Sequence, residues 1–185
     1  MKKSVIGILI ALAALGVLTV IGFVLFLLLL RAPYNITHED TWEQFNGSGY
    51  SITLPPDLEE GDASYTNTAI TTIDSYYNSQ CQVIIGYIPM TKQEVKVSER
   101  IDLFSLVQNY FPIKDQNGNP LNIQIRGEMA YAEYPYTYES LNYMVLEGIY
   151  LGSDGLYEVE IHCMADSYDD YKEYFFMWLD SFVVY

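Results

Sequence analysis

The sequence predicts an α+β protein, with an N-terminal transmembrane helix followed by one domain in which helices pack on a largely antiparallel sheet. Three observations lead to this fold class. Residues 5–30 contain no charged side chain. The rest of the 185-residue chain reads as strands, a helix, four further strands and a second helix, with no internal repeat. That order lacks the strand–helix alternation of a parallel sheet, so we expect antiparallel pairing.

The apolar run at residues 5–30 is long enough to cross a membrane. As a helix it would extend about 39 Å at roughly 1.5 Å per residue, against a hydrocarbon core of ~30 Å. A cleaved signal peptide is the competing interpretation, but its apolar region is shorter and ends at small residues. Here the run ends at Arg31-Ala32-Pro33, so we expect an uncleaved signal anchor.

Basic residues set the expected orientation of this helix. Lys2 and Lys3, together with the amino terminus, outweigh Arg31 at the other end. The positive-inside rule then keeps residues 1–4 in the cytoplasm and exports everything after the helix. We therefore expect a single-pass protein of a bacterial cell membrane, in contact with the lipid bilayer through residues 5–30.

The exported part is strongly acidic. Of the nine Lys and Arg, three lie at or before Arg31, so six stand against 24 Asp and Glu, a balance of −18. A field of that sign repels nucleic acid and anionic lipid headgroups. We expect no nucleic-acid partner for this domain.

The first half of the exported part should contain a spacer, three strands and one helix. Residues 31–48 are polar with scattered aromatic residues, which predicts a juxtamembrane spacer before a domain at 49–185. Turn residues delimit the expected strands, the second of them at a sheet edge. The strands are predicted at 49–55, 68–73 and 81–88, and the helix at 98–110, with Ser98 as its N-cap, Ile101, Phe104, Val107 and Tyr110 along one face, and Pro112 as its stop.

The second half reads as four strands and a helix that lead to a final short stretch, Ser181 to Tyr185. Asn117-Gly118 and Ser153-Asp154-Gly155 supply turns before the first and the last strand. The helix carries aromatic residues on one face and acidic residues near its N-terminal end. The strands are predicted at 121–126, 128–138, 141–151 and 156–164, and the helix at 166–182, with Tyr168, Tyr171, Phe175, either Trp178 or Leu179, and Phe182 facing the sheet.

This arrangement resembles the PsbP-like fold, which occurs in a subunit of photosystem II and in many small exported bacterial proteins. Three segments carry the resemblance: "GYSITLPP" at the start, "RGEMAYAEY" after the first helix, and the final strand and helix that close on Ser181-Phe182. The resemblance covers about residues 49–183. It implies an α/β/α sandwich around an antiparallel sheet, with roles in binding and assembly and no shared catalytic site.

The sequence offers no pattern for catalysis, a cofactor or a metal. His38 and His162 are the two histidines, and neither H-x-x-x-H nor C-x-x-C occurs. Strand alternation turns His162 away from the core. Adjacent carboxylates such as Glu59-Glu60 do not face each other across a cleft. We therefore expect no enzyme, and no catalytic, cofactor-binding or metal-ligating residue.

Two cysteines, Cys81 and Cys163, fall in predicted strands, and both should point toward the apolar side of the sheet. An oxidising compartment permits a disulfide between them, provided that their Cα atoms lie within about 7 Å. Two buried free thiols are the alternative. The sequence leaves both open.

Five of the 18 tyrosines lie within residues 128–145. Alternation places Ala130 and Ala132 on the same face as Tyr134, Tyr136 and Tyr138, which suggests close packing against a helix at one end and a wider margin at the other. Tyrosine is also a strong strand former, so the cluster first serves the sheet. What remains as a candidate ligand or partner face is Tyr134, Tyr136 and Tyr138. Pro135 indicates an edge or bulged position there.

These observations predict a membrane-anchored, non-catalytic domain that binds another envelope or membrane protein or assists its assembly. The alternative is an extracytoplasmic receptor or enzyme that binds a sugar or peptide on the tyrosine-rich strand. A receptor needs a concave pocket with several tyrosines on one exposed face. An assembly scaffold should instead show those rings packed under helices or scattered over a convex surface.

Overall fold

The computed structural model describes residues 35–62, 70–110 and 113–185. The predicted cytoplasmic segment 1–4 and the predicted transmembrane helix 5–30 lie outside the described residues. Within those described, no helix combines the length and apolar character needed to cross a bilayer.

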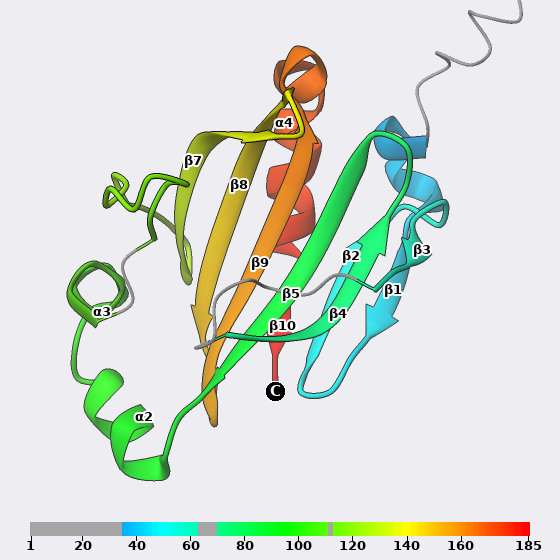
Figure 1. Cartoon of the computed structure of the whole chain (residues 1–185). Helices are drawn as coiled ribbons and strands as arrows, with labels where there is room; N and C mark the ends of the chain where they lie inside the picture. Colours follow the sequence, from blue (N-terminus) through cyan, green and yellow to red (C-terminus); the bar gives the residue numbers. More distant parts are fainter. Residues whose placement is uncertain (1–34, 63–69, 111–112) are drawn as a thin grey trace, which may run out of the picture. The chain divides into compact units, whose positions relative to one another are not determined.

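A seven-stranded antiparallel sheet forms the centre of the part of the domain that the structure describes (Figure 1). Its strand order is β3-β4-β5-β9-β8-β7-β6, so the expected antiparallel α+β class is confirmed. The strands are β3 (Glu59–Glu60), β4 (Thr71–Tyr77), β5 (Cys81–Pro89), β6 (Gln124–Arg126), β7 (Met129–Tyr138), β8 (Leu141–Leu151) and β9 (Gly155–Met164).

The strands predicted at 81–88, 128–138, 141–151 and 156–164 agree with β5, β7, β8 and β9. β6 is shorter than the strand predicted at 121–126, β3 was not predicted, and the segment at 68–73 also differs. There the described strand β4 begins at Thr71 and continues to Tyr77. It was expected at a sheet edge, but β3 pairs with its last two residues and forms the outer strand. The Ser, Thr and Asn composition of this region hid the strand's true length, because such residues favour turns.

One long helix, α4 (Ala165–Asp180), covers one face of the large sheet. The prediction of a helix at 166–182 with an aromatic inner face is confirmed. The rings of Phe175 and Trp178 lie 5.0 Å apart, and both side chains are fully buried. Burying each such ring contributes on the order of 2–3 kcal/mol, so this helix is a principal source of the domain's stability.

A second, three-stranded sheet packs in the same core, where the sequence predicted a spacer at 31–48. Its order is β1-β2-β10, and two short 3-10 helices precede it. The Trp42 ring lies 6.0 Å from that of Trp178, edge to face. The spacer prediction is therefore wrong for residues 35–48, whose apolar side chains follow neither a helical nor a strand period. The elements are η1 (Asn35–Thr37), η2 (Glu39–Thr41), β1 (Glu43–Asn46), β2 (Tyr50–Leu54) and β10 (Val183–Val184).

Two short helices replace the single helix predicted at 98–110. They are α2 (Lys92–Ser98) and α3 (Leu103–Tyr110). The reciprocal capping box between Thr91 and Glu94 begins α2, so Ser98 lies at the end of a helix and is no N-cap. The Asp102 carboxylate accepts the Ser105 N–H at 2.9 Å at the start of α3. The sequence analysis did not predict that a separate helix begins here.

The short helix α3 packs on the face of the sheet opposite α4, but only at one end. Its Leu106 and Val107 belong to the same apolar cluster as Ala130 and Ala132 of β7. Small side chains on β7 let the helix approach closely, as the sequence predicted. The two faces of the sheet are therefore covered unequally.

The β7–β8 hairpin offers a test of local strain. Glu139 and Ser140, between the paired residues Tyr138 and Leu141, have φ angles of 48° and 69°. Such a turn favours Asn-Gly, since side chains at positive φ cost roughly 1–2 kcal/mol per residue. The double change Glu139→Asn with Ser140→Gly should raise the free energy of unfolding by about 1–2 kcal/mol in urea titrations.

Ser79→Gly, in the turn between β4 and β5, is the matched control. Its φ is not positive, so added backbone freedom should lower stability by about 0.5–1 kcal/mol. Equal effects of the two changes would contradict the strain at Glu139 and Ser140.

Candidate functional site

A hollow of about 640 Å³ opens on the part of the sheet that α3 leaves uncovered. The β4–β5 and β7–β8 hairpins turn at the same end of the sheet (Figure 1). The residues that line the hollow lie toward that end, on the face away from α4. We call it the tyrosine hollow after the five tyrosines that line it: Tyr77, Tyr134, Tyr136, Tyr138 and Tyr143.

Strand register explains why these rings meet. Directly paired residues in a sheet point to the same face. Tyr136 of β7 pairs with Tyr143 of β8, which pairs with Met164 of β9. The next row along runs from Tyr134 through Val145, His162 and Gln82 to Tyr77, and so joins β7 to β4 across five strands.

The three tyrosines singled out from the sequence do share one face, and they run from floor to rim. Tyr134 is 7% exposed, Tyr136 is half-buried, and Tyr138 is 55% exposed. Tyr131 points to the other face and packs edge-on against Phe176, 5.1 Å between ring centroids. The structure adds Tyr77 of β4 and Tyr143 of β8, whose place on the same face as the β7 tyrosines depends on strand order and register.

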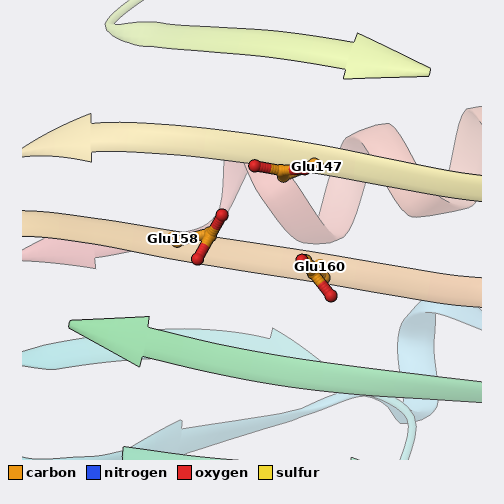
Figure 2. A group of neighbouring side chains, drawn as sticks. All are labelled: Glu147, Glu158 and Glu160. Atoms are coloured by element: carbon orange, nitrogen blue, oxygen red, sulfur yellow. The ribbon is translucent and has the colours of Figure 1, made fainter. Parts of the chain in front are cut away.

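Three carboxyl groups meet near the floor of the hollow. Glu147 of β8 and Glu160 of β9 are direct cross-strand partners, and Glu158 stands two residues before Glu160 (Figure 2). One carboxylate oxygen from each lies within 4.8 Å of the others. Glu147 and Glu158 are 4% and 6% exposed. Like charges placed directly opposite in a sheet destabilise it, so this cluster cannot be fully ionised without compensation.

Protonation of Glu147 is one way in which the repulsion among the three carboxyl groups is reduced. Burial raises the pKa of its carboxyl well above the ordinary value of 4.5, and the charge and hydrogen bond of Glu158 raise it further, as does the charge of Glu160. The Tyr134 hydroxyl donates to Glu147 at 2.9 Å and acts in the opposite direction. A proton held in the cluster therefore reduces its charge. The same three carboxylates have the donor chemistry that suits a hard divalent cation.

His162 joins the cluster to the aromatic wall. Its Nε2 lies 2.7 Å from a Glu160 carboxylate oxygen, and its ring meets the Tyr136 ring edge to face at 5.8 Å. His162 faces away from the α4 core as expected, but it is half-buried within the hollow. The alternation Glu158-x-Glu160-x-His162 was visible in the sequence, whereas the link to Glu147 depends on the register of β8 with β9.

The lining of the hollow contains neither Lys nor Arg. Two of the domain's cations are engaged elsewhere, Lys172 with Glu133 at 2.6 Å and Arg126 with Asp180 at 2.7 Å. The remaining polar lining of the hollow consists of neutral side chains from the β4–β5 hairpin. The hollow is therefore an aromatic and negatively charged surface.

Cys81 and Cys163 lie on the opposite face, buried under α4 as free thiols. They are direct partners in the β5–β9 ladder, and their direction toward the apolar core is confirmed. Burial raises the pKa of the Cys163 thiol to about 12 and that of Cys81 further. The disulfide named as one alternative stays a prediction.

Comparison with solved structures finds similar folds at low sequence identity. The solution structure of cyanobacterial PsbP (CyanoP) from Synechocystis sp. PCC 6803 matches with a TM-score of 0.48 and 12% identity, over 78% of this chain and 93% of that chain. A crystal structure from Bacteroides thetaiotaomicron VPI-5482 matches with a TM-score of 0.52 and 11% identity, over 78% of this chain and 49% of that one. This chain thus spans about half the length of the Bacteroides protein.

At 12% and 11% identity, both similarities concern the fold alone. No protein-family model matches the sequence, and no curated protein matches it. Folds of this kind host unrelated roles, so the function has to follow from the site itself.

Replacing Glu147 with Gln tests the carboxyl cluster. An acid whose pKa is raised on folding loses stability as pH rises above its ordinary value of 4.5, because the unfolded chain releases the proton more readily. The amide introduced by Glu147→Gln would carry no charge and could still accept from Tyr134. The variant should therefore be more stable than the wild type near pH 8, and the difference should shrink toward about pH 4 in urea unfolding curves.

Glu173→Gln, at an exposed position on α4, is the matched control and should leave the pH dependence unchanged. If the free energy of unfolding of the Glu147→Gln variant still changes with pH as steeply as that of the wild type, the Glu147 carboxyl does not hold the proton.

The cysteine pair predicts an oxidation product. Partners in an antiparallel ladder have Cα atoms roughly 4.5–5.5 Å apart, within the reach of a disulfide. When the full-length chain folds with oxidised glutathione, both thiols should be oxidised while the glutathione disulfide is reduced. We expect an intact mass lower by two hydrogen atoms and a free energy of unfolding higher by about 2–4 kcal/mol. Two alkylatable thiols after this treatment would contradict the prediction, and Cys81→Ser with Cys163→Ser is the control.

Proposed function

We propose that this protein is a membrane-anchored, non-catalytic binding module of the cell envelope, which binds a peptide segment of another envelope protein in the tyrosine hollow. The single observation that carries the proposal is the concavity of the site. Five tyrosines line one hollow of about 640 Å³, within the volume range of ordinary ligand sites. A scaffold whose tyrosines serve only the sheet would not need them gathered around an open space.

The rim of the hollow supports contact with a partner chain. Tyr77, Tyr138 and Leu141 are 44%, 55% and 48% exposed, although they are large apolar side chains. They lie at or beside the two hairpins that border the hollow. Aromatic residues that keep a polar atom are well suited to interfaces, because they bury much area at little entropic cost.

The edge of the sheet beside the hollow favours docking on the face over addition of a strand. β6 pairs only with Met129 to Tyr131, so β7 beyond that point is an edge strand. Pro135 has no N–H to donate there, as its position in the sequence indicated. The Thr137 N–H is taken by the Gln116 side chain at 2.9 Å. A partner would gain few backbone hydrogen bonds along this edge.

The contacts of His162 favour binding over catalysis. A general base must lie within hydrogen-bond reach of the group that it activates. The contacts described for His162 are with the carboxylate of Glu160 and the ring of Tyr136. These contacts fix the imidazole as part of the wall of the hollow. We therefore assign it a structural role in ligand binding.

Export and anchoring rest on the uncharged run at 5–30 and on the acidic composition after it. An anchor of this length would hold the domain close to the membrane surface, where partners embedded in the same membrane are present at high effective concentration. A weak individual site can then suffice for recognition.

Photocrosslinking from the rim tests the proposal. The full-length chain would carry benzoylphenylalanine in place of Tyr138, in its native membrane. The same label at Val97 of α2, which is 50% exposed and outside the hollow, is the control. We expect one discrete protein adduct from position 138 that is absent from position 97. It should be lost when Tyr136→Ala is added, because that ring forms the inner wall.

Three results would contradict the proposal. They are the same adducts from both positions, an adduct from position 138 that is indifferent to Tyr136→Ala, and adducts with glycan in place of protein. The last result would instead favour the sugar receptor.

A further inference from the structure

We propose that the tyrosine hollow selects a cationic group, the side chain of a lysine or arginine carried by the bound peptide. This inference rests on the proposed function and names the chemistry of its ligand. It follows from three properties of the hollow: aromatic walls, a carboxylate on the floor, and a lining without Lys or Arg.

The walls present aromatic rings from two adjacent strands. Tyr136 and Tyr143 are direct cross-strand partners, and Tyr138 follows Tyr136 toward the rim on the same face. The face of an aromatic ring carries partial negative charge and attracts an ammonium or guanidinium group within about 6 Å. Rings on adjacent strands can therefore contact opposite sides of one alkyl chain and its charged head.

The floor supplies a carboxylate group. Glu160 lines the hollow, and its side chain is 14% exposed, so it can meet a ligand without being freely solvated. An imidazole that donates from Nε2 to Glu160 orients the carboxylate and leaves its charge in place. In so enclosed a place, a carboxylate interacts more strongly with a cation than it would in water.

The carboxyl groups behind the floor strengthen the same preference. Glu147 and Glu158 lie with Glu160 in one cluster; burial raises the pKa of Glu147, and the charges of Glu158 and Glu160, which repel a charge on Glu147, raise it further. A cation placed against Glu160 relieves that repulsion. An anionic ligand would add to it, and the hollow offers no Lys or Arg side chain in return.

A neutral sugar would use the rings and leave the charge of Glu160 without a partner from the ligand. Selectivity is a difference between two affinities, and the carboxylate contributes only for a cationic ligand. A lysine or arginine side chain uses both features. Charge complementarity therefore favours a basic peptide over the other occupants.

The test compares peptides that differ in one side chain. The probes are Ac-Gly-Gly-Xaa-Gly-Gly-amide, with lysine, trimethyllysine, norleucine or glutamate as Xaa. Binding to the full-length chain would be followed by NMR chemical-shift titration. We expect the lysine and trimethyllysine peptides to bind at least about tenfold more tightly than the norleucine peptide, and the glutamate peptide not to bind.

Four variants complete the test. Glu160→Gln and Tyr136→Leu should each weaken lysine-peptide binding by about tenfold. Tyr138→Leu changes a rim ring that is 55% exposed, so it probes the wall without risk to the core. Glu173→Gln removes the same charge from exposed α4, and binding should be unchanged.

Equal binding of the lysine and norleucine peptides, or unchanged lysine binding by Glu160→Gln, would overturn the cationic ligand while leaving a peptide-binding hollow. Binding of none of the peptides would also overturn it. The adduct from position 138 then decides separately whether the proposed function stands.

Discussion

Unequal coverage of the large sheet is the constraint on which the rest of the structure depends. Side chains alternate between the two faces of a sheet, so each face must either be buried by other elements or carry side chains that tolerate water. The long helix α4 and the small sheet bury one face, and the Trp178 and Phe175 side chains that pack there are fully buried. The eight residues of α3 cover only one end of the other face. The uncovered end must be tolerable to water and still support the strands, and tyrosine meets both needs because it combines a broad ring with a hydroxyl group.

The carboxyl cluster shows that this end of the sheet is not built for stability alone. A strand centre is an unfavourable place for Glu147 and Glu158, and apolar residues of similar size would pack there at lower cost. Their cost is reduced by a retained proton and by the hydroxyl of Tyr134. Buried polar groups that weaken a fold commonly mark a functional site. Here they lie beside Glu160, the carboxylate that lines the hollow.

The fold could be predicted from the sequence where periodicity was strong and local. The alternation around Val159 and Ile161 and the aromatic stripe through Phe175 and Trp178 each specify their element. The spacer prediction was wrong for residues 35–48 because Trp42 and the fully buried Ile36 are apolar core residues that follow no regular period. Only the part of the site that lies on a single strand could be predicted, again because local alternation was the available signal. Tyr134, Tyr136 and Tyr138 share a strand, so alternation alone groups them, whereas Tyr77, Tyr143 and Glu147 reach the hollow through strand order and register.

The pairing of β2 with β10 has a consequence for biogenesis. Residues near the start of the domain, Tyr50 and Ser51, find their partners in Val184 and Val183. A chain synthesised from its amino end therefore keeps β2, and the apolar side of the large sheet, uncovered until α4 and β10 have emerged. Contacts between such distant segments form late. The domain would thus complete its fold only after its last strand has been synthesised.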